Sequence, residues 1–335
     1  MKLSIIIILN KRYEYIANCL ASIYLALKHI EDRAEVELVL VIDSLNDDIE
    51  KKVAELRSMI SVKVSIADEE CKSMLRNYAV SEASGEILYF IDDDATVKED
   101  FIEKVLQKFK QYPDVQIIGG PNLTPADSSL FERAQGYVLS SFWGAAGMKK
   151  RYNVSAGDYR ADQQSLILCN LGMRRSALDS DNELFDMRLY CNEENHLLKK
   201  LGKRDCRMVF SPEIIVYHFR RKKLWQYCCQ VFNSGRGRAI SMRLDTMNFG
   251  FVFLLPGFFA LYIILFPVIN AIWPVALFPV IVYGLLCMLY ALDILIKREK
   301  NLAVMIICFM LFPFSHFCYG LGLISGFLMY LKGKR

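Results

Sequence analysis

Two long stretches of the sequence contain no Asp, Glu, Lys or Arg: residues 249 to 292 and residues 302 to 331. The cores of soluble proteins seldom contain uncharged segments of this length, whereas a membrane-spanning helix needs about 20 mostly apolar residues. The first stretch is too long for one such helix, and Trp273-Pro274 interrupts it. The lack of charge therefore predicts a membrane domain at 249–331 with about three transmembrane helices, at 249–271, 275–296 and 302–330.

The ten cysteines include no CxxC pair, and their spacing along the chain fits neither a zinc site nor a disulfide framework. We interpret most of them as buried thiols in a reducing compartment. A secretory signal is also lacking, because the apolar run at 3–9 is short and is followed by Asn10-Lys11-Arg12. We therefore expect the soluble part of the chain to lie in the cytoplasm.

Acidic residues are absent from residues 220 to 243, which carry seven Lys or Arg together with aromatic and apolar side chains. Directly before the uncharged stretches, this composition predicts a basic amphipathic interfacial helix at 220–245 that lies on anionic membrane lipids. A nucleic-acid-binding patch is the alternative. The adjoining membrane segments argue against it, so we expect no nucleic-acid partner.

In the remainder of the chain, apolar runs typical of strands alternate with segments of helical period. The predicted strands are 3–9, 36–42, 61–66, 86–91 and 115–120, and the predicted helices are 13–28, 47–59, 71–83 and 99–110. This order predicts an α/β domain at 1–219 with a mixed, mainly parallel sheet and helices on both faces. Ligands bind beyond the carboxyl ends of the strands in such sheets. Asn10, Asp43 and the run Asp92-Asp93-Asp94 all follow strands at that edge.

The acidic run 92–94 directly follows an apolar strand, where like charges repel one another. Mg²⁺ binds oxygen ligands and commonly shares one or two carboxylates with substrate phosphates. Asp92 and Asp94 lie two residues apart and can face the same side of an extended chain, whereas Asp93 points to the other side. The pattern therefore predicts a Mg²⁺ or Mn²⁺ site for Asp92 and Asp94, with a solvated turn as the alternative. We expect Asp93 to tolerate substitution best.

Three further positions on the predicted sheet domain each allow two interpretations. Asp43 either accepts a hydrogen bond from a base or ribose or caps the next helix, a role that Asp47 or Asn46 can also fill. Lys72 and Arg76 lie one helical turn apart and face either a phosphate or solvent.

Two candidates lie later in the soluble part. Glu193-Glu194 begins a predicted helix at 194–202, where the two acids either favour the helix dipole or supply a general base. His218 follows a strand-like run and precedes two arginines. A lone histidine is more often a structural residue than a metal ligand, but the neighbouring arginines argue against an apolar surrounding.

Together these residues resemble the inverting family 2 glycosyltransferases with the GT-A fold. The similar subgroup is the membrane-bound type of bacterial exopolysaccharide assembly, such as the succinoglycan-type glucosyltransferases. The resemblance covers the whole chain, and its most specific segment is SMLRNYAVSEASGEILYFIDDDA at 73–95. Other segments follow in the family's order: VIDSLNDD, IIGGPNLTP, NLGMRRSAL, NEENHLLKKLGK and PEIIVYHFRRKKLWQYCCQVFNSGRGRA.

The resemblance implies a role for each candidate residue. Asp43 would bind the uracil or ribose of a nucleotide-sugar, Arg76 would lie near its diphosphate, and Asp92 would lie near the ribose. Asp94 would be the direct metal ligand, and His218 would complete the metal or diphosphate site. Glu193-Glu194 occupies the place of the family's catalytic acid pair, with Glu194 as the general base. Asn10 and Lys72 are assigned to nucleotide-sugar binding as well.

The chain departs from the family pattern in several places. Glu194 stands where the family has Asp, which keeps a carboxylate but changes its reach. The first strand ends in Ile8-Leu9-Asn10 without the usual proline. The turn that contains Asp43 reads IDSL, which lacks one acid and the glycine of the family's DDGS-like turn. These two departures concern the nucleotide side of the site. The QxxRW signature of processive synthases is absent, which argues against processive polymerisation.

The resemblance implies a membrane-anchored inverting hexosyltransferase of the inner membrane, multi-pass, with a cytoplasmic catalytic domain. It would use Mg²⁺ or Mn²⁺ and move a sugar from a nucleotide-sugar, for which we expect a UDP-sugar, to a lipid-linked saccharide in cell-surface polysaccharide or glycoconjugate biosynthesis. One alternative is transfer to polyprenyl phosphate, and another is an inactive nucleotide-binding membrane scaffold. A transporter is disfavoured, because Asp293 is the only acidic or basic side chain predicted inside the spans before their ends.

The membrane topology leaves two interpretations open. Positively charged loops favour the cytoplasmic side, which suits the short segment KREK at 297–300. Three spans would then place the basic tail 332–335 outside, unless one segment is re-entrant at its prolines. Gly322 and Gly326 form a pair of small residues that either packs helices closely or faces lipid.

Overall fold

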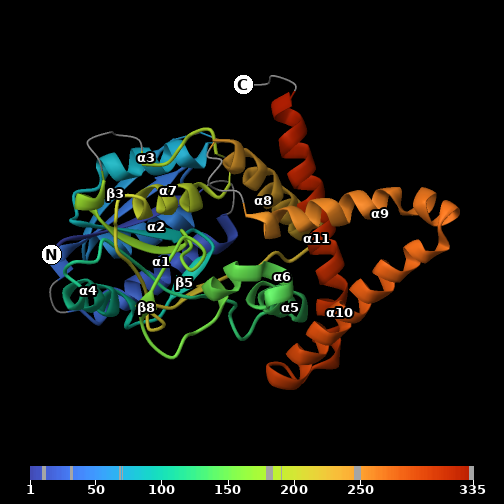
Figure 1. Cartoon of the computed structure of the whole chain (residues 1–335). Coiled ribbons are helices and arrows are strands. Elements are labelled where there is room, and N and C mark those ends of the chain that lie inside the picture. Colours follow the sequence, from blue (N-terminus) through green and yellow to red (C-terminus); the bar gives the residue numbers. More distant parts are fainter. Residues whose placement is uncertain are drawn as a thin grey trace. The chain divides into compact units, whose positions relative to one another are not determined.

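The computed structural model describes residues 1–9, 13–30, 33–67, 69, 71–178, 184–189, 191–244 and 250–331. Asn10 lies outside the described residues, as do residues 245 and 249 at the edges of predicted segments and the basic tail 332–335. The chain forms two units, which are described separately (Figure 1). The first unit comprises Met1–Leu123 and Lys150–Phe219, and the second comprises Thr124–Lys149 and Arg220–Arg335.

An eight-stranded sheet organises the first unit. Its strands lie in the spatial order β3 (Ser61–Ile66), β2 (Val36–Ile42), β1 (Leu3–Leu9), β4 (Ile87–Asp92), β9 (Asn170–Arg174), β6 (Ile117–Gly119), β10 (Met208–Phe210) and β8 (Tyr159–Arg160). The first four strands are parallel to one another, and β6 is parallel to β10. β9 runs antiparallel to both neighbours, and β8 runs antiparallel to β10. The predicted mixed, mainly parallel sheet is confirmed.

Helices cover both faces of this sheet. α1 (Tyr13–Lys28), α2 (Asp47–Arg57) and α4 (Phe101–Gln111) share a core with one face, and α3 (Lys72–Glu82) and α7 (Glu193–Gly202) share a core with the other. Along β1, Ile5 and Ile7 belong to the first core and Ile6 to the second, because successive side chains of a strand point to opposite faces. Burial on both faces explains why the central strands are almost continuously apolar.

A smaller sheet of three strands lies at the end of β4. Its order is β5 (Ala95–Val97), β11 (Val216–His218) and β7 (Asn122–Leu123). β5 follows β4 after the two-residue turn Asp93-Asp94. β11 pairs antiparallel with β5 and parallel with β7, which brings the end of the first unit back to the acidic run.

The second unit is helical. Its main helices are α5 (Leu130–Ser140), α6 (Phe142–Ala145), α8 (Leu224–Leu244), α9 (Leu255–Ile272), α10 (Leu277–Lys297) and α11 (Leu302–Leu331). Among the described residues, the segments Phe251–Ile272, Pro274–Lys297 and Leu302–Met329 are long and apolar enough to cross a membrane. These three segments agree in number and position with the predicted transmembrane helices.

Glycines allow α8 and α11 to approach each other closely. A Cβ atom on Gly235 of α8 would lie 2.1 Å from the carbonyl oxygen of Tyr319, and one on Gly322 of α11 would lie 1.9 Å from that of Phe232. A Cβ on Gly326 would meet Arg236 and Ala239 at 2.7 Å. The pair Gly322 and Gly326 therefore packs against a helix, which is the first of the two predicted possibilities.

The short helix α6 is anchored between α10 and α11. The indole Nε1 of Trp143 donates a hydrogen bond to Cys287 Sγ at 3.4 Å, and its ring stacks on Tyr290 with centroids 5.6 Å apart. The backbone oxygen of Trp143 can only accept, so His316 donates to it through Nε2 at 2.8 Å. The other ring nitrogen of His316 lies 2.8 Å from the Tyr283 hydroxyl. The histidine thus links Trp143 of α6 to Tyr283 of α10 within the second unit.

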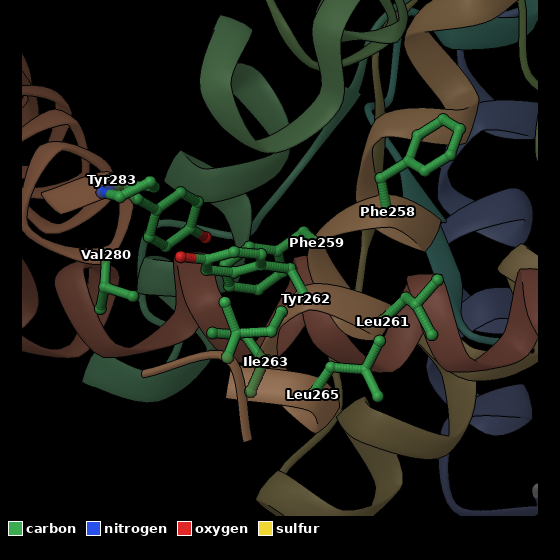
Figure 2. Close-up of a pocket in the computed structure, with 10 residues that line it drawn as sticks. Phe258, Phe259, Leu261, Tyr262, Ile263, Leu265, Val280 and Tyr283 are labelled. Carbon is green, nitrogen blue, oxygen red and sulfur yellow. The ribbon is translucent and has the colours of Figure 1, made fainter. Parts of the chain in front are cut away.

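An apolar pocket of about 540 Å³ lies between α9 and α10. Figure 2 shows Phe259 and Tyr262 of α9 beside Tyr283 of α10, and the rings of Phe259 and Tyr283 stack with centroids 4.4 Å apart. The lining is almost entirely hydrocarbon, as is typical of surfaces that face lipid chains.

Candidate functional site

Two aspartates and a histidine meet at the carboxyl end of β4. Asp92 is the last residue of β4, and Asp94 ends the turn that leads into β5. The pairing of β11 with β5 places His218 opposite Ala95. As a result, His218 Nε2 lies 3.0 Å from Asp94 Oδ1 and 3.8 Å from Asp92 Oδ2. The small sheet thus brings together three residues that are far apart in the sequence.

Asp92 is ionised at neutral pH. Desolvation by the surrounding protein would by itself raise the pKa of this carboxyl. The hydrogen bond from His218 and the positive charges of Arg76 and Lys72 outweigh that effect and lower the pKa to about 2. The side chain of Asp92 is still 36% exposed, whereas Asp94 and His218 are buried. Asp92 therefore presents a negative charge on the open side of the site.

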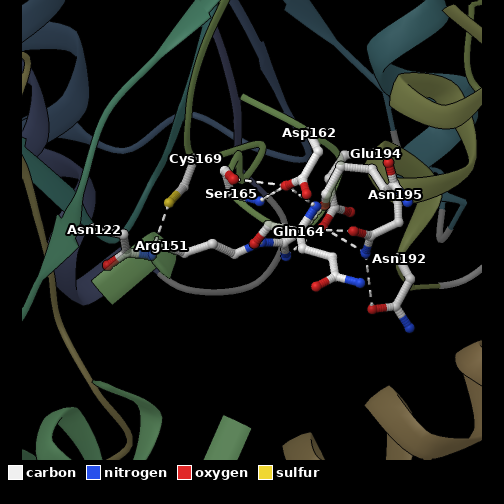
Figure 3. Close-up of polar contacts among 10 residues, drawn as sticks. Asn122, Arg151, Asp162, Gln164, Ser165, Cys169, Asn192, Glu194 and Asn195 are labelled. Atoms are coloured by element: carbon white, nitrogen blue, oxygen red, sulfur yellow. Dashed lines mark hydrogen bonds and ion pairs between the residues drawn. The ribbon is translucent and has the colours of Figure 1, made fainter. Parts of the chain in front are cut away.

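A cysteine lies beside these groups. The ligand atoms of Asp92, His218 and Cys169 all lie within 4.8 Å of one another. Cys169 immediately precedes β9, the strand that pairs with β4, and its sulfur accepts a hydrogen bond from Asn122 Nδ2 at 2.9 Å (Figure 3). Carboxylate oxygen and imidazole nitrogen are ligands for divalent cations. The donors present here therefore fit a divalent ion.

Arg76 connects this cluster to α7. Its guanidinium group forms an ion pair with Glu193, and both side chains are buried. Nη2 of the same guanidinium lies 3.9 Å from Asp92 Oδ1. Glu193 thus holds a positive charge in place next to the acidic run, on the side of the site where a diphosphate was predicted.

Glu194 lies in a second buried network on the first turn of α7. Arg151 donates from Nη1 to Glu194 Oε1 at 3.2 Å and from Nη2 to Asn195 Oδ1, and Asn195 Nδ2 donates to Glu194 Oε1 at 3.0 Å. Figure 3 shows Arg151 reaching this carboxylate from outside α7. The backbone oxygens of Gln163 and Gln164 accept from the same guanidinium at 2.5 and 3.1 Å. Both donors bind one carboxylate oxygen, so the orientation of Glu194 is fixed.

The pKa of Glu194 is raised above its ordinary value. Burial raises it, the positive charge of Arg151 lowers it, and the negative charge of Glu193 raises it again. A carboxylate with a raised pKa is a better proton acceptor than a solvated one. The geometry and the protonation behaviour of Glu194 both suit a general base.

Of the remaining predicted residues, Asp43 and Lys72 lie at the same edge of the sheet or next to it. Asp43 directly follows β2. Its side chain accepts hydrogen bonds from the Tyr13 hydroxyl and, at 3.0 Å, from the backbone N of Ser44. Asn46, not Asp43, caps α2 by accepting from Ile49 N at 2.9 Å. Lys72 is exposed at the first residue of α3. Asn10 cannot be placed, because it lies outside the described residues.

Arg151, Asn195 and Cys169 belong to the site but are absent from the sequence-based candidates. Arg151 lies in a 3₁₀ segment without a periodic pattern, and Cys169 directly precedes β9, whose partner β4 is distant in the sequence. The one available signal was the position of Asn195 directly after Glu193-Glu194. Neither spacing nor composition indicates that Arg151 or Cys169 reaches the acidic residues.

Comparison with known proteins identifies the family. Residues 4–180 match the model of "Glycosyl transferase family 2". No curated protein matches this chain.

Solved structures show the same fold at low sequence identity. The mannosyltransferase PcManGT from Pyrobaculum calidifontis, in complex with GDP-Man and Mn²⁺, is 16% identical with a TM-score of 0.55, covering 74% of this chain and 65% of that one. A TarS 1-349 structure from S. aureus in complex with UDP-GlcNAc is 17% identical with a TM-score of 0.52, covering 72% and 66%. This chain spans only 42% of another S. aureus TarS chain, which it matches with a TM-score of 0.49.

These likenesses confirm the GT-A-like fold that the sequence predicts. The family match includes β1 through β4, the acidic run and β9. Since the match extends over more than half of its length, the chain belongs to glycosyl transferase family 2.

Proposed function

We propose that this protein is a membrane-anchored, inverting, metal-dependent hexosyltransferase that moves a sugar from a nucleotide-sugar to a lipid-linked saccharide. The observation that carries the proposal is the convergence of Asp92, Asp94 and His218 with the two acids of α7 at the carboxyl edge of one sheet. A UDP-sugar is the proposed donor, and cell-surface polysaccharide or glycoconjugate synthesis is the proposed setting. The donors seen with the structural neighbours, UDP-GlcNAc and GDP-Man, support a nucleotide-sugar.

Charged residues at the carboxyl edge of the sheet would bind the nucleotide-sugar donor. Asp43, at the end of β2, is positioned to accept a hydrogen bond from the base or ribose. Asp92, Asp94 and His218 would hold Mg²⁺ or Mn²⁺, which supplies positive charge to the leaving diphosphate. Arg76 and Lys72 add positive charge on the side of α3. Fixed positive groups stabilise the leaving group without reorganising during the reaction.

The transfer step needs a base for the acceptor hydroxyl. Glu194 takes that proton as the oxygen attacks the anomeric carbon, and the nucleoside diphosphate leaves from the opposite face, which inverts the configuration. Arg151 and Asn195 hold Glu194 through Oε1, so Oε2 is the atom that receives the proton. Burial favours this transfer, because the carboxylate becomes a stronger base as water is excluded.

The lipid character of the acceptor rests on the second unit. Its three apolar segments would anchor the protein in the membrane, and the exposed Lys222 and Lys223 directly before α8 would lie on anionic headgroups. Trp225 is 77% exposed and Leu224 44%, as expected for side chains that enter the interfacial layer. The proposed location is the inner membrane with the first unit in the cytoplasm, where nucleotide-sugars are made.

A transfer assay tests this proposal. Membranes that contain the protein are incubated with a panel of labelled nucleotide-sugars, Mn²⁺ and lipid extract, and the labelled lipid is identified. We expect one donor to label a lipid, and the Asp94→Asn variant to lower the rate ~10²–10³-fold because the diphosphate charge is no longer neutralised. Asp93→Asn is the matched control and should retain most of the activity. Full activity of Asp94→Asn, with normal membrane insertion, would contradict the metal role.

A further inference from the structure

The sulfur of Cys169 lies within the proposed metal site, where only oxygen and nitrogen ligands were expected. Its distance to a carboxylate oxygen of Asp92 and a ring nitrogen of His218 is at most 4.8 Å. A divalent ion placed among three such atoms can contact all of them. We propose that Cys169 is a ligand of the divalent ion and that its thiolate selects Mn²⁺ over Mg²⁺. The inference rests on the proposed function and specifies the cofactor of that site.

The backbone holds Cys169 in this position. The next residue, Asn170, begins β9 and is tied down by three buried hydrogen bonds. Its Nδ2 donates to Pro121 O at 3.0 Å and to Ile214 O at 2.8 Å, and its Oδ1 accepts from Tyr89 OH at 2.6 Å. Cys169 is itself only 1% exposed. The sulfur is therefore fixed at the site before any ion binds, as a preorganised ligand requires.

Asn122 provides the supporting contact that a metal-bound thiolate uses. Its Nδ2 donates to Cys169 Sγ at 2.9 Å, and the side chain is 1% exposed. A hydrogen bond of this kind orients a metal ligand toward the ion. Asn122 lies on β7, which pairs with β11, so the small sheet supplies both this donor and His218.

The ligand set decides between the two candidate ions. Mg²⁺ requires oxygen ligands in near-octahedral geometry. Mn²⁺ also binds carboxylates, but as a first-row transition metal it accepts imidazole nitrogen and thiolate sulfur more readily than Mg²⁺ does. Binding of the ion displaces the thiol proton, which leaves to solvent, and forms the metal–sulfur bond. The two buried donors, His218 and Cys169, form the closed side of the site, and the partly exposed Asp92 lies on its open side. The open side keeps positions for diphosphate oxygens.

Absorption spectroscopy with Co²⁺ tests the sulfur ligand without any sugar donor. The full-length protein is purified in detergent, treated with a chelator and titrated with Co²⁺, with bound metal measured by equilibrium dialysis. We expect a sulfur-to-cobalt charge-transfer band in the near ultraviolet for the wild-type protein and for the control Cys206→Ser. The band should disappear in Cys169→Ser and weaken in His218→Ala. Bound Co²⁺ without the band in the wild type, or an unchanged band in Cys169→Ser, would overturn the proposal.

Competition between Mn²⁺ and Mg²⁺ tests the selectivity. Bound Mn²⁺ is followed by its electron paramagnetic resonance signal while Mg²⁺ is added. Loss of the sulfur ligand should weaken Mn²⁺ binding ~10–100-fold in Cys169→Ser and leave Mg²⁺ binding little changed. Equal Mn²⁺ preference in the variant and the wild type would contradict the inference. If the transfer assay fails but the cobalt band appears, the proposed function fails and the ligand assignment stands; the reverse outcome removes only the ligand assignment.

Discussion

Glu194 lies between two charges of opposite sign, Arg151 and Glu193, and its protonation depends on both. At the scale of single residues, the two adjacent acids Glu193 and Glu194 therefore have different roles, although the sequence alone does not distinguish them. Glu193 forms an ion pair with Arg76, whereas Glu194 accepts hydrogen bonds from Arg151 and Asn195. The adjacent acids thus have different partners, and we assign the general base only to Glu194.

The pH dependence of the transfer rate tests the role of Arg151. Only the ionised form of Glu194 accepts a proton, so the rate falls as the pH drops through its pKa. Burial raises this pKa and Arg151 lowers it, so Arg151→Gln should raise it further and move the acid limb of kcat/KM to higher pH. Arg151→Lys should restore much of the original profile. Arg160→Gln, on an exposed side chain of the same unit, is the control. An unmoved acid limb in Arg151→Gln would contradict this account.

The sequence reveals the acidic residues of the site but not their supporting contacts. Asp92 and Asp94 are recognisable because a charged run directly follows an apolar strand, and Glu193-Glu194 because it precedes a helix. Cys169 and Arg151 depend on long-range geometry. β9 lies between β4 and β6 in the sheet, an order that the alternation of strands and helices does not predict.

At the scale of elements, the ion pair between Arg76 and Glu193 joins α3 to α7. Both side chains are buried, so removal of one partner leaves a charge without compensation in the interior. We expect Arg76→Leu to destabilise the first unit by about 3–5 kcal/mol. Chemical denaturation followed by circular dichroism measures the change. Arg188→Ala, which removes an exposed arginine from an ion pair with Asp186, should have little effect. Equal effects of the two variants would argue against a special role for the buried pair.

The contact between α8 and α11 gives a second test at this scale. Because a Cβ at Gly322 would lie 1.9 Å from the Phe232 carbonyl oxygen, Gly322→Ala forces the two helices apart. Overpacking of this kind costs about 1–3 kcal/mol. The thermal unfolding midpoint of the detergent-solubilised protein should fall. Gly284→Ala is the matched control, since nothing lies within 4 Å of its added Cβ. If both variants unfold at the wild-type temperature, the close packing is not required for stability.

Long elements are predicted better than short ones. The strand at 3–9 and the helix at 13–28 have the bounds that their apolar patterns indicate. Strands of two or three residues, such as β5, β7 and β8, are too short to show alternation, and pairing with distant strands defines them. These short strands nevertheless carry the site, because β5 and β11 bring His218 to Asp94.

At the scale of the whole molecule, α5 contacts the loop after α10 within the second unit. α5 belongs to Thr124–Lys149, the segment of the second unit that lies between the two parts of the first unit in the sequence. Within the second unit, Arg133 of α5 pairs with Glu299, and Arg298 donates to Ser140 Oγ at 2.8 Å. The positive charges of KREK in this loop predict that it lies on the cytoplasmic side of the membrane.

A protease site inserted after Trp273 tests this topology. With the first unit in the cytoplasm, as proposed, and with α9 and α10 each crossing the membrane, we expect the turn between them on the opposite face. We expect cleavage in sealed vesicles only when the protease is added to that opposite face. The natural trypsin sites of the first unit report the other face in the same preparation. Cleavage of both the inserted site and the first unit by protease added to one face would show that α9 and α10 do not cross the membrane.

Fold class and the membrane segments are readable from the sequence because both depend on local apolar patterns repeated over many residues. The grouping of Thr124–Lys149 with the C-terminal helices is different. Its apolar side chains Ala134 and Val138 pack with α10 and α11, more than 140 residues away in the chain. A local pattern cannot indicate which distant helix a buried side chain will meet.

The most direct test of the central claim is the transfer rate of Glu194→Gln with the labelled donor, Mn²⁺ and lipid extract. Glutamine keeps the size of the side chain but cannot accept the acceptor's proton. The account predicts a ~10²–10⁴-fold loss of transfer with donor binding retained. Wild-type transfer by Glu194→Gln would contradict it and would favour polyprenyl phosphate as the acceptor, because a phosphate oxygen needs no base. Donor binding by the wild type without transfer to any lipid would instead favour a nucleotide-binding scaffold.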